Sequence, residues 1–208
     1  MSLRLRARVL RPTGPERAEY FDDALVSVDG GRVQALRPWA DGDDADEDLR
    51  RDGVITPGYV DTHLHFPQTR CMGRASGPLL DWLQQSIFPE EARFANLAYA
   101  EEVAREFVNA LLDAGTTDCL AYGSVHAEAC SVLFQAFADS GLRAAAGPAL
   151  MERDAPAQLC RGEAESLAGL EKLHTSWHGA GEGRLRLAVL PRFALSCDAD
   201  LLAAAGRF

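Results

Sequence analysis

The feature that most constrains the fold is a regular alternation of apolar and amphipathic segments after Pro57. The apolar segments have the length of strands, and the amphipathic ones have helical spacing and end at glycines such as Gly115 and Gly141. Four successive β-α units predict a parallel sheet with right-handed crossovers. The predicted strands are residues 54–65, 116–126, 142–151 and 184–194, and the predicted helices are residues 98–115, 127–141, 165–179 and 198–208.

Such a sheet can be a doubly wound open sheet or part of a (β/α)8 barrel. An open sheet usually carries a glycine-rich phosphate loop after its first strand, whereas residues 65–73 here read HFPQTRCMG. The barrel is therefore favoured. A complete barrel has roughly 250 residues, and about 150 residues follow Pro57. We expect an α/β fold that contains the N-terminal part of a TIM barrel, with about four β-α units.

Residues 1–56 follow a different pattern, in which short strand-like pieces are separated by Gly, Pro and Asp. The Asp29-Gly30-Gly31 sequence is typical of a hairpin turn. We expect a small antiparallel β element over 1–56, as part of a composite β-sandwich, and an incomplete barrel over 57–208. The acidic segment 41–48, DGDDADED, cannot contribute to a core and is predicted to be a solvated loop.

Charge and composition narrow the classes of partner. The net charge of −10 would repel phosphate backbones and anionic lipid headgroups, which disfavours nucleic acid and membranes as partners. The five cysteines are scattered and never form a C-x-x-C motif, which indicates a reducing compartment. No apolar run has the length of a signal peptide core or a membrane helix. We expect a cytoplasmic protein with a small ligand, and the composition is compatible with a homodimer.

Two of the five histidines, His63 and His65, lie two residues apart at the end of the first predicted barrel strand. Side chains alternate faces along a strand, so both imidazoles are predicted to face the barrel interior, at the end where barrel enzymes have their active sites. Two satisfied core histidines are the structural alternative. Without strong partners, however, two polar rings in an apolar layer would be costly. A divalent metal, zinc by preference, would be such a partner.

A catalytic zinc site needs at least one further protein ligand. His174 and His178 lie four residues apart in a helix predicted to pack outside the barrel, and they lack the Glu of H-E-x-x-H. We expect them to be solvated surface side chains. His126 ends the second predicted strand and could reach the barrel mouth, where a structural and a functional role are equally open.

The residues also carry a family resemblance. Residues 57–65, PGYVDTHLH, resemble the opening of the amidohydrolase superfamily, in which a zinc- or iron-bound hydroxide attacks carbon centres. Further segments, in matching order and spacing along nearly the whole chain, resemble the guanine deaminase family within it. These segments are HFPQTR with Gln68, PLLDWLQQSIFPEEARF at 78–94, SVH ending at His126, LMERDAP at 150–156 and LPRFALSC at 190–197.

The resemblance implies a role for each matching residue. His63 and His65 match two metal ligands, with zinc as the expected metal and iron as the alternative. Gln68 matches the glutamine that contacts the purine, and Arg192 and Phe193 match the residues that read the guanine edge and pack on the ring. Leu79 and Trp82 match positions that line the pocket. The implied reaction is hydrolytic deamination of guanine, or of a related purine, to xanthine and ammonia in purine catabolism.

Some family features have no counterpart in this chain. The family usually has Asp and Asn where Glu152 and Asp154 stand, a departure we expect to matter little. The family takes two further histidine ligands, an aspartate ligand and a proton-carrying glutamate from later strands, so these are expected beyond Phe208 and no residue here is predicted to be catalytic. The chain is therefore expected to be truncated. Two alternatives stay open: an inert fragment or complementing half-barrel, and an amidohydrolase that acts on another heterocyclic amine.

Overall fold

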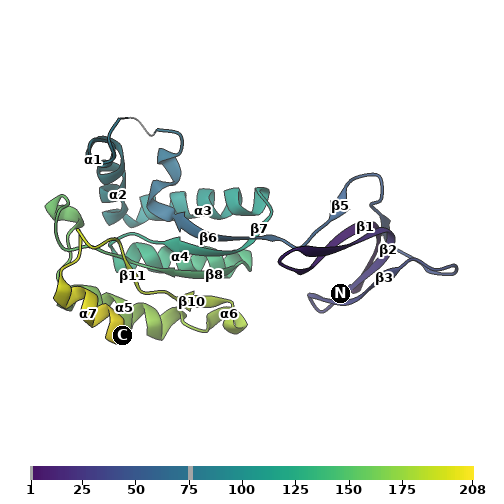
Figure 1. The fold of residues 1–208 in the computed structure, drawn as a ribbon. Coiled ribbons are helices and arrows are strands. Elements are labelled where there is room, and N and C mark those ends of the chain that lie inside the picture. Colours follow the sequence, from purple (N-terminus) through teal and green to yellow (C-terminus); the bar gives the residue numbers. More distant parts are fainter. Residues whose placement is uncertain (1, 75–76) are drawn as a thin grey trace. The chain divides into compact units, whose positions relative to one another are not determined.

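The computed structural model describes residues 2–74 and 77–208, and its residues form two compact units, Met1–Gly58 and Tyr59–Phe208. The first unit is a sheet built on a hairpin of long strands (Figure 1). Its strands are β1 (Ser2–Gly14), β2 (Arg17–Asp29), β3 (Arg32–Pro38), β4 (Glu47–Asp48) and β5 (Val54–Ile55). β1, β2 and β3 pair antiparallel, and β1 also pairs in parallel with β4 and β5.

Alternating side chains of these strands form the small core of the first unit, which includes the buried Ala7, Val9, Ala24 and Val26. The hairpin between β2 and β3 turns at Gly30 and Gly31, both with positive φ, as the sequence predicts. The acidic segment 41–48 is mostly exposed and without regular structure, as predicted, except that its last two residues form β4 and Asp43 pairs with Arg37 at 2.5 Å.

The second unit contains a parallel four-stranded sheet with the order β10-β8-β7-β6. Its strands are β6 (Tyr59–His65), β7 (Thr116–Tyr122), β8 (Arg143–Gly147) and β10 (Leu185–Leu187), and β9 (Ala149–Leu150) pairs in parallel with β11 (Leu190–Pro191). The strand order follows the chain without reversal. A doubly wound sheet would reverse direction at a switch point, so the order is that of a (β/α) barrel segment.

The main helices of this unit are α3 (Leu97–Asp113), α4 (Ala127–Ser140), α5 (Glu163–Trp177) and α7 (Ala199–Arg207), with a short α6 (Ala180–Gly183). Neighbours in the chain pack together, α3 on α4, α4 on α5 and α5 on α7, which forms one helical layer beside the sheet (Figure 1). The core between them is apolar and centres on buried aromatic and aliphatic residues, including Phe107, Leu133, Phe134 and Phe137. The predicted fold class, an α/β partial barrel after a small β element, is confirmed.

A bent helical segment connects β6 to α3. A 3-10 turn (Phe66–Cys71) follows β6 directly. Further along the chain, α1 (Leu79–Trp82), a π-helical turn (Leu83–Ile87), α2 (Phe88–Ala92) and a second 3-10 turn (Arg93–Ala95) follow one another without a break. Ile87, Phe88 and Leu83 of this segment are buried against Val125, Ala149 and Met151, which follow β7 and β8. The segment is thereby fixed beside the carboxyl ends of the strands. Among the described residues, no helix has the length and apolar character needed to cross a bilayer.

Candidate metal and ligand site

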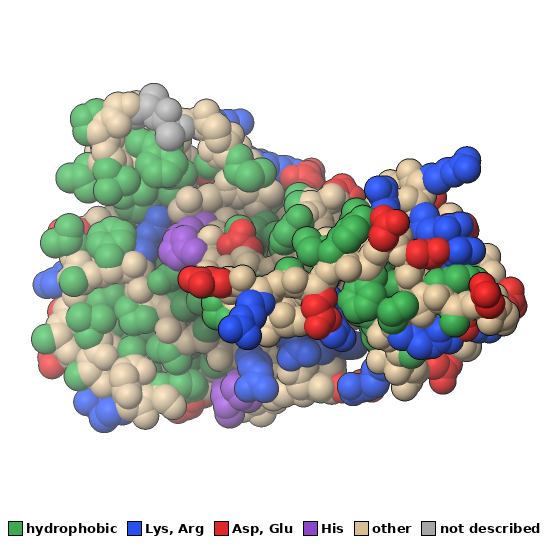
Figure 2. Space-filling model, turned by 45° about the vertical axis from the view of Figure 1, so that its right-hand side comes forward, with side chains coloured by type: hydrophobic (Ala, Val, Ile, Leu, Met, Phe, Trp, Pro, Cys, Tyr) green, Lys and Arg blue, Asp and Glu red, His purple; other side chains and the backbone are tan. Residues whose placement is uncertain are grey.

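The imidazoles of His63 and His65 converge at the end of β6. The alternation of the strand places both on one face, and their Nε2 atoms lie 3.3 Å apart. The backbone N–H of His63 donates to the Asp61 carboxylate at 3.1 Å. His63 is exposed and His65 is half-buried, and Figure 2 shows histidine side chains that reach the surface of the larger unit.

The spacing of the two Nε2 atoms fits a shared metal ion. Two nitrogens that ligate one tetrahedral zinc at about 2.0 to 2.1 Å are separated by about 3.3 to 3.4 Å. The observed distance of 3.3 Å matches this separation, and in the absence of a metal it is also that of a hydrogen bond between the two rings. Within 2–74 and 77–208, however, no group of three or more His, Cys, Asp or Glu side chains is placed to hold a metal. Among the described residues, His63 and His65 are therefore two candidate ligands without a third beside them.

The surroundings of His65 keep it neutral. Its ring stacks on Tyr122 of β7, with the ring centroids 4.7 Å apart and the planes 9° from parallel. Burial, together with the positive charge of Arg192 and the neighbouring His63, lowers the pKa of His65 from 6.5 to about 4. At neutral pH the ring is therefore uncharged, and a neutral imidazole is the form that ligates a metal.

Gln68 and Arg192, predicted to contact the ligand, are joined through Glu91 of α2. One Glu91 carboxylate oxygen accepts from the Gln68 amide nitrogen at 3.0 Å, and the other accepts from the Arg192 guanidinium at 2.5 Å. The Arg192 and Glu91 side chains are each only 5% exposed. Arg192 also lies over the Phe88 ring, 5.6 Å from its centroid. The fold thus brings together three polar side chains that are far apart in the sequence.

A cavity of about 410 Å³ lies beside these groups, and its lining includes His63, His65, Gln68 and Trp82. The Trp82 indole nitrogen is buried without a hydrogen-bond partner among the described residues. Three predicted ligand contacts, Arg192, Leu79 and Phe193, lie outside this lining. Leu79 is 64% exposed at the start of α1, and Phe193 is 37% exposed after β11. Four of the seven predicted site residues therefore line one cavity, Arg192 is joined to Gln68 through Glu91, and Leu79 and Phe193 lie at the surface.

Comparison with known proteins identifies the family of the chain. The family model described as "Amidohydrolase family" matches residues 54–207, which is most of the chain and all of the partial barrel. The chain belongs to the amidohydrolase family.

The chain is similar to guanine deaminases over their N-terminal part. It is 35% identical over 193 residues to the guanine deaminase of Escherichia coli K12, and 36% identical over 197 residues to a probable guanine deaminase of Deinococcus radiodurans. Each alignment covers 90% of this chain and 44% of the relative. The structure of the Escherichia coli guanine deaminase superposes with a TM-score of 0.88 at 30% identity, over 100% of this chain and 50% of that one. The amidohydrolase chain spans about half the length of the relatives it matches.

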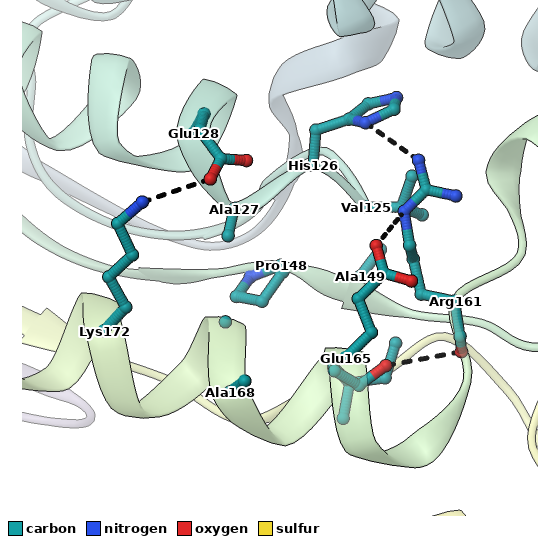
Figure 3. A pocket seen from close by; sticks show the side chains of 13 residues that line it. Val125, His126, Ala127, Glu128, Pro148, Ala149, Arg161, Glu165, Ala168 and Lys172 are labelled. Carbon is teal, nitrogen blue, oxygen red and sulfur yellow. Dashed lines mark hydrogen bonds and ion pairs between the residues drawn. The ribbon is translucent and has the colours of Figure 1, made fainter.

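His126 lies outside the cavity at His63 and lines another cavity of about 290 Å³ (Figure 3). Its Nδ1 atom is 3.0 Å from the guanidinium of Arg161, which pairs with Glu165 at 2.9 Å. A guanidinium can only donate, so Nδ1 accepts and the neutral ring carries its proton on Nε2. That Nε2 is buried without a partner among the residues the structure describes. Burial and the charge of Arg161 together lower the pKa of His126.

The remaining histidines agree with their prediction as surface side chains. His174 and His178 are both exposed on and just after α5, with ring centroids 4.7 Å apart. Within the part of the chain that the structure describes, the one hydrogen bond to either ring comes from the backbone N–H of Leu187, which donates to His178 Nδ1 at 3.3 Å.

Two residues of the site were not predicted from the sequence. Tyr122 is the last residue of β7 and stacks on His65. The sequence pattern of β7 does not indicate which of its side chains contacts His65. Glu91 lies in the FPEE motif beside a second carboxylate, Glu90, and the local sequence gives no signal that distinguishes the two. Which of Glu90 and Glu91 faces the site could not be predicted, since the turn of the bent helical segment decides it.

Proposed function

We propose that this amidohydrolase forms the metal- and purine-binding part of a zinc-dependent aminohydrolase that converts guanine and water to xanthine and ammonia. The observation that carries the proposal is the buried Gln68–Glu91–Arg192 group beside two imidazoles whose spacing fits one zinc ion. The similarity to guanine deaminases supports the choice of substrate.

In this proposal His63 and His65 hold the metal through their Nε2 atoms. When bound, zinc supplies Lewis-acid chemistry: it lowers the pKa of water and so provides a nucleophile near neutral pH. Deamination forms a carbon–oxygen bond and breaks the bond to the exocyclic nitrogen, which leaves as ammonia. The proton transfer that this exchange needs is assigned to no residue of the chain.

The remaining side chains orient the substrate. Arg192 offers guanidinium donors to a ring carbonyl, and the Gln68 amide can donate and accept at the ring edge. Leu79 and Phe193 keep their proposed contacts with the purine only if the α1 segment and the segment after β11 move toward the ligand, since both are exposed.

The test is calorimetric titration of guanine into the chain with zinc, for the wild type and for Arg192→Met. We expect binding in the wild type and a loss of about tenfold or more in the variant, because a charge-assisted hydrogen bond contributes about 1.5 to 3 kcal/mol. Arg105→Met, which removes an exposed arginine of α3, is the matched control and should bind like the wild type. Absence of guanine binding by the wild type would contradict the proposal.

Only two candidate metal ligands lie together among the described residues, which favours a second candidate function. In this second candidate the chain binds the purine but does not convert it to product. Measuring xanthine and ammonia in the same samples separates the candidates. Product formation supports the aminohydrolase, whereas guanine binding without product supports the non-catalytic binding module. Tight binding of another heterocyclic amine in preference to guanine would instead support the alternative substrate.

A further inference from the structure

Glu91 occupies a bridging position between the two side chains that the proposed function assigns to the purine. Glu91 is 4% exposed and lies in the short helix α2. The buried side chains of Ile87 and Phe88 fix the position of this helix. Each of its carboxylate oxygens has a separate partner, Gln68 at 3.0 Å and Arg192 at 2.5 Å. A single rigid acid therefore holds both side chains.

The chemistry of a carboxylate determines how the Gln68 amide is oriented. An ionised carboxylate only accepts hydrogen bonds, so the amide must direct its NH2 group, and not its carbonyl oxygen, toward Glu91. The guanidinium of Arg192 only donates. Of the two side chains, only Gln68 then offers an acceptor, which is its carbonyl oxygen. Because Glu91 holds both side chains, it also fixes the position of this oxygen relative to the Arg192 donors.

We propose that Glu91 is a positioning residue that sets the polarity of this pair, with Gln68 accepting from a ring N–H and Arg192 donating to the adjacent ring carbonyl. This inference deepens the proposed function and rests on it for the identity of the ligand as a purine. The pair then selects purines whose six-membered ring has the lactam edge, an N–H beside a C=O.

The selection follows from the pattern of donors and acceptors. Guanine and hypoxanthine present a ring N–H next to a carbonyl oxygen, which matches the acceptor of Gln68 and the donors of Arg192. Adenine presents the reverse pattern, a bare ring nitrogen next to an amino group. Against the fixed pair, adenine would set acceptor against acceptor and donor against donor, and groups that were desolvated on binding would remain unpaired.

Replacement of Glu91 by an amide removes the constraint. The side chain of Glu91→Gln can either accept from Gln68 or donate to it, so both orientations of the Gln68 amide become accessible. Discrimination between the two edge patterns should then decrease. The adjacent Glu90 provides a matched control, because it is also a buried carboxylate of α2 but contacts Tyr99 and Arg93 instead.

The experiment compares hypoxanthine and adenine, which share a ring skeleton and differ in this edge, in titrations of the full chain. We expect the wild type and Glu90→Gln to prefer hypoxanthine by about tenfold or more, the effect of one buried group left unpaired. In Glu91→Gln the preference should fall to about threefold or less. An unchanged preference in Glu91→Gln would overturn the proposal.

A second measurement does not depend on any ligand. The side-chain NH2 protons of Gln68, identified by their absence in Gln68→Leu, should be shifted and protected from exchange in the wild type and in Glu90→Gln. They should lose this protection in Glu91→Gln. If no purine binds, the proposed function fails, and unaffected Gln68 signals in Glu91→Gln would separately overturn the positioning role.

Loss of the Glu91 charge leaves buried Arg192 without its partner, which can prevent folding. Glu91→Asp is therefore the second variant. It retains the charge beside Arg192, while its shorter side chain cannot reach both partners. We expect Glu91→Asp to show the same loss of Gln68 protection and of preference for hypoxanthine, and retention of both would overturn the proposal.

Discussion

Among the glycines that the structure describes, Gly147 has the least room for a side chain. A Cβ atom at this position would lie 1.9 Å from the carbonyl oxygen of Ala188, because Ala188 lies directly beside the end of β8, where its N–H donates to the carbonyl oxygen of Ala146 at 2.8 Å. Backbone atoms cannot yield as a flexible side chain can. We predict that Gly147→Ala lowers the free energy of unfolding by more than about 2 kcal/mol, measured by urea denaturation.

Gly206→Ala is the control for this prediction. A Cβ atom there meets nothing within 4 Å, and the residue lies in helix α7. Alanine is favoured over glycine in a helix by up to about 1 kcal/mol, so this variant should be neutral or slightly stabilised. Equal effects of the two substitutions would contradict the assigned close approach at Gly147.

His126 should titrate below the ordinary range of histidine. Its burial and the facing charge of Arg161 lower its pKa, while Glu128 and Glu165 act in the opposite direction. We predict that Arg161→Met raises the pKa of His126, as followed by the pH dependence of its ring resonances in NMR. Lys172→Met, on the other side of the same cavity, removes a charge that does not contact His126 and should have a smaller effect (Figure 3).

The lowered pKa also has a consequence for stability. The folded state holds His126 neutral, whereas the unfolded chain binds a proton near pH 6.5. The contribution to stability is therefore complete above about pH 6.5 and decreases as the pH falls below that value toward the folded-state pKa. In His126→Gln this part of the pH dependence should be absent.

At the scale of elements, helix α3 depends on its amino-terminal cap. The Asn96 side chain accepts from the backbone N–H groups of Ala98 at 3.0 Å and Tyr99 at 3.4 Å. We predict that Asn96→Ala lowers the free energy of unfolding by about 1 kcal/mol, whereas Asn96→Asp, which retains the acceptor, changes it little. Equal losses in both variants by thermal denaturation would argue against a capping role.

Most elements of the partial barrel could be predicted from periodicity, because each helix has one apolar face and each strand is a short apolar run. The points at which strands are interrupted could not be predicted from periodicity. The predicted strand 142–151 is interrupted at Pro148, which has no N–H to donate, and continues as β9. The predicted strand 54–65 is divided between β5 and β6, which belong to different units, and local hydrophobicity carries no information about that partition.

The candidate site was predictable to the extent that local motifs carry it. The alternation of β6 is sufficient to place His63 and His65 on one face. The Glu91–Arg192 pair joins residues 101 positions apart, and it forms because the bent segment after β6 packs on the ends of other strands. Such pairing depends on tertiary packing, which a single sequence read for local patterns does not contain.

At the scale of the whole molecule, the apolar core between sheet and helices is formed without any metal ligand. We therefore expect the chain to remain folded in the presence of a chelator. Zinc should still raise the melting temperature, because a ligand at one hundred times its dissociation constant stabilises the folded state by about 2.7 kcal/mol. In the double variant His63→Ala and His65→Ala the zinc-dependent increase should disappear, and its persistence would place the metal elsewhere.

The most direct test of the proposed site is a crystal structure of the chain grown with zinc and guanine. We predict a zinc ion bound to the Nε2 atoms of His63 and His65, and a guanine ring whose lactam edge contacts Gln68 and Arg192. A guanine ring located away from Gln68 and Arg192, or a zinc ion bound without the two histidines, would contradict the assignment of this partial barrel as the metal- and purine-binding part of an aminohydrolase.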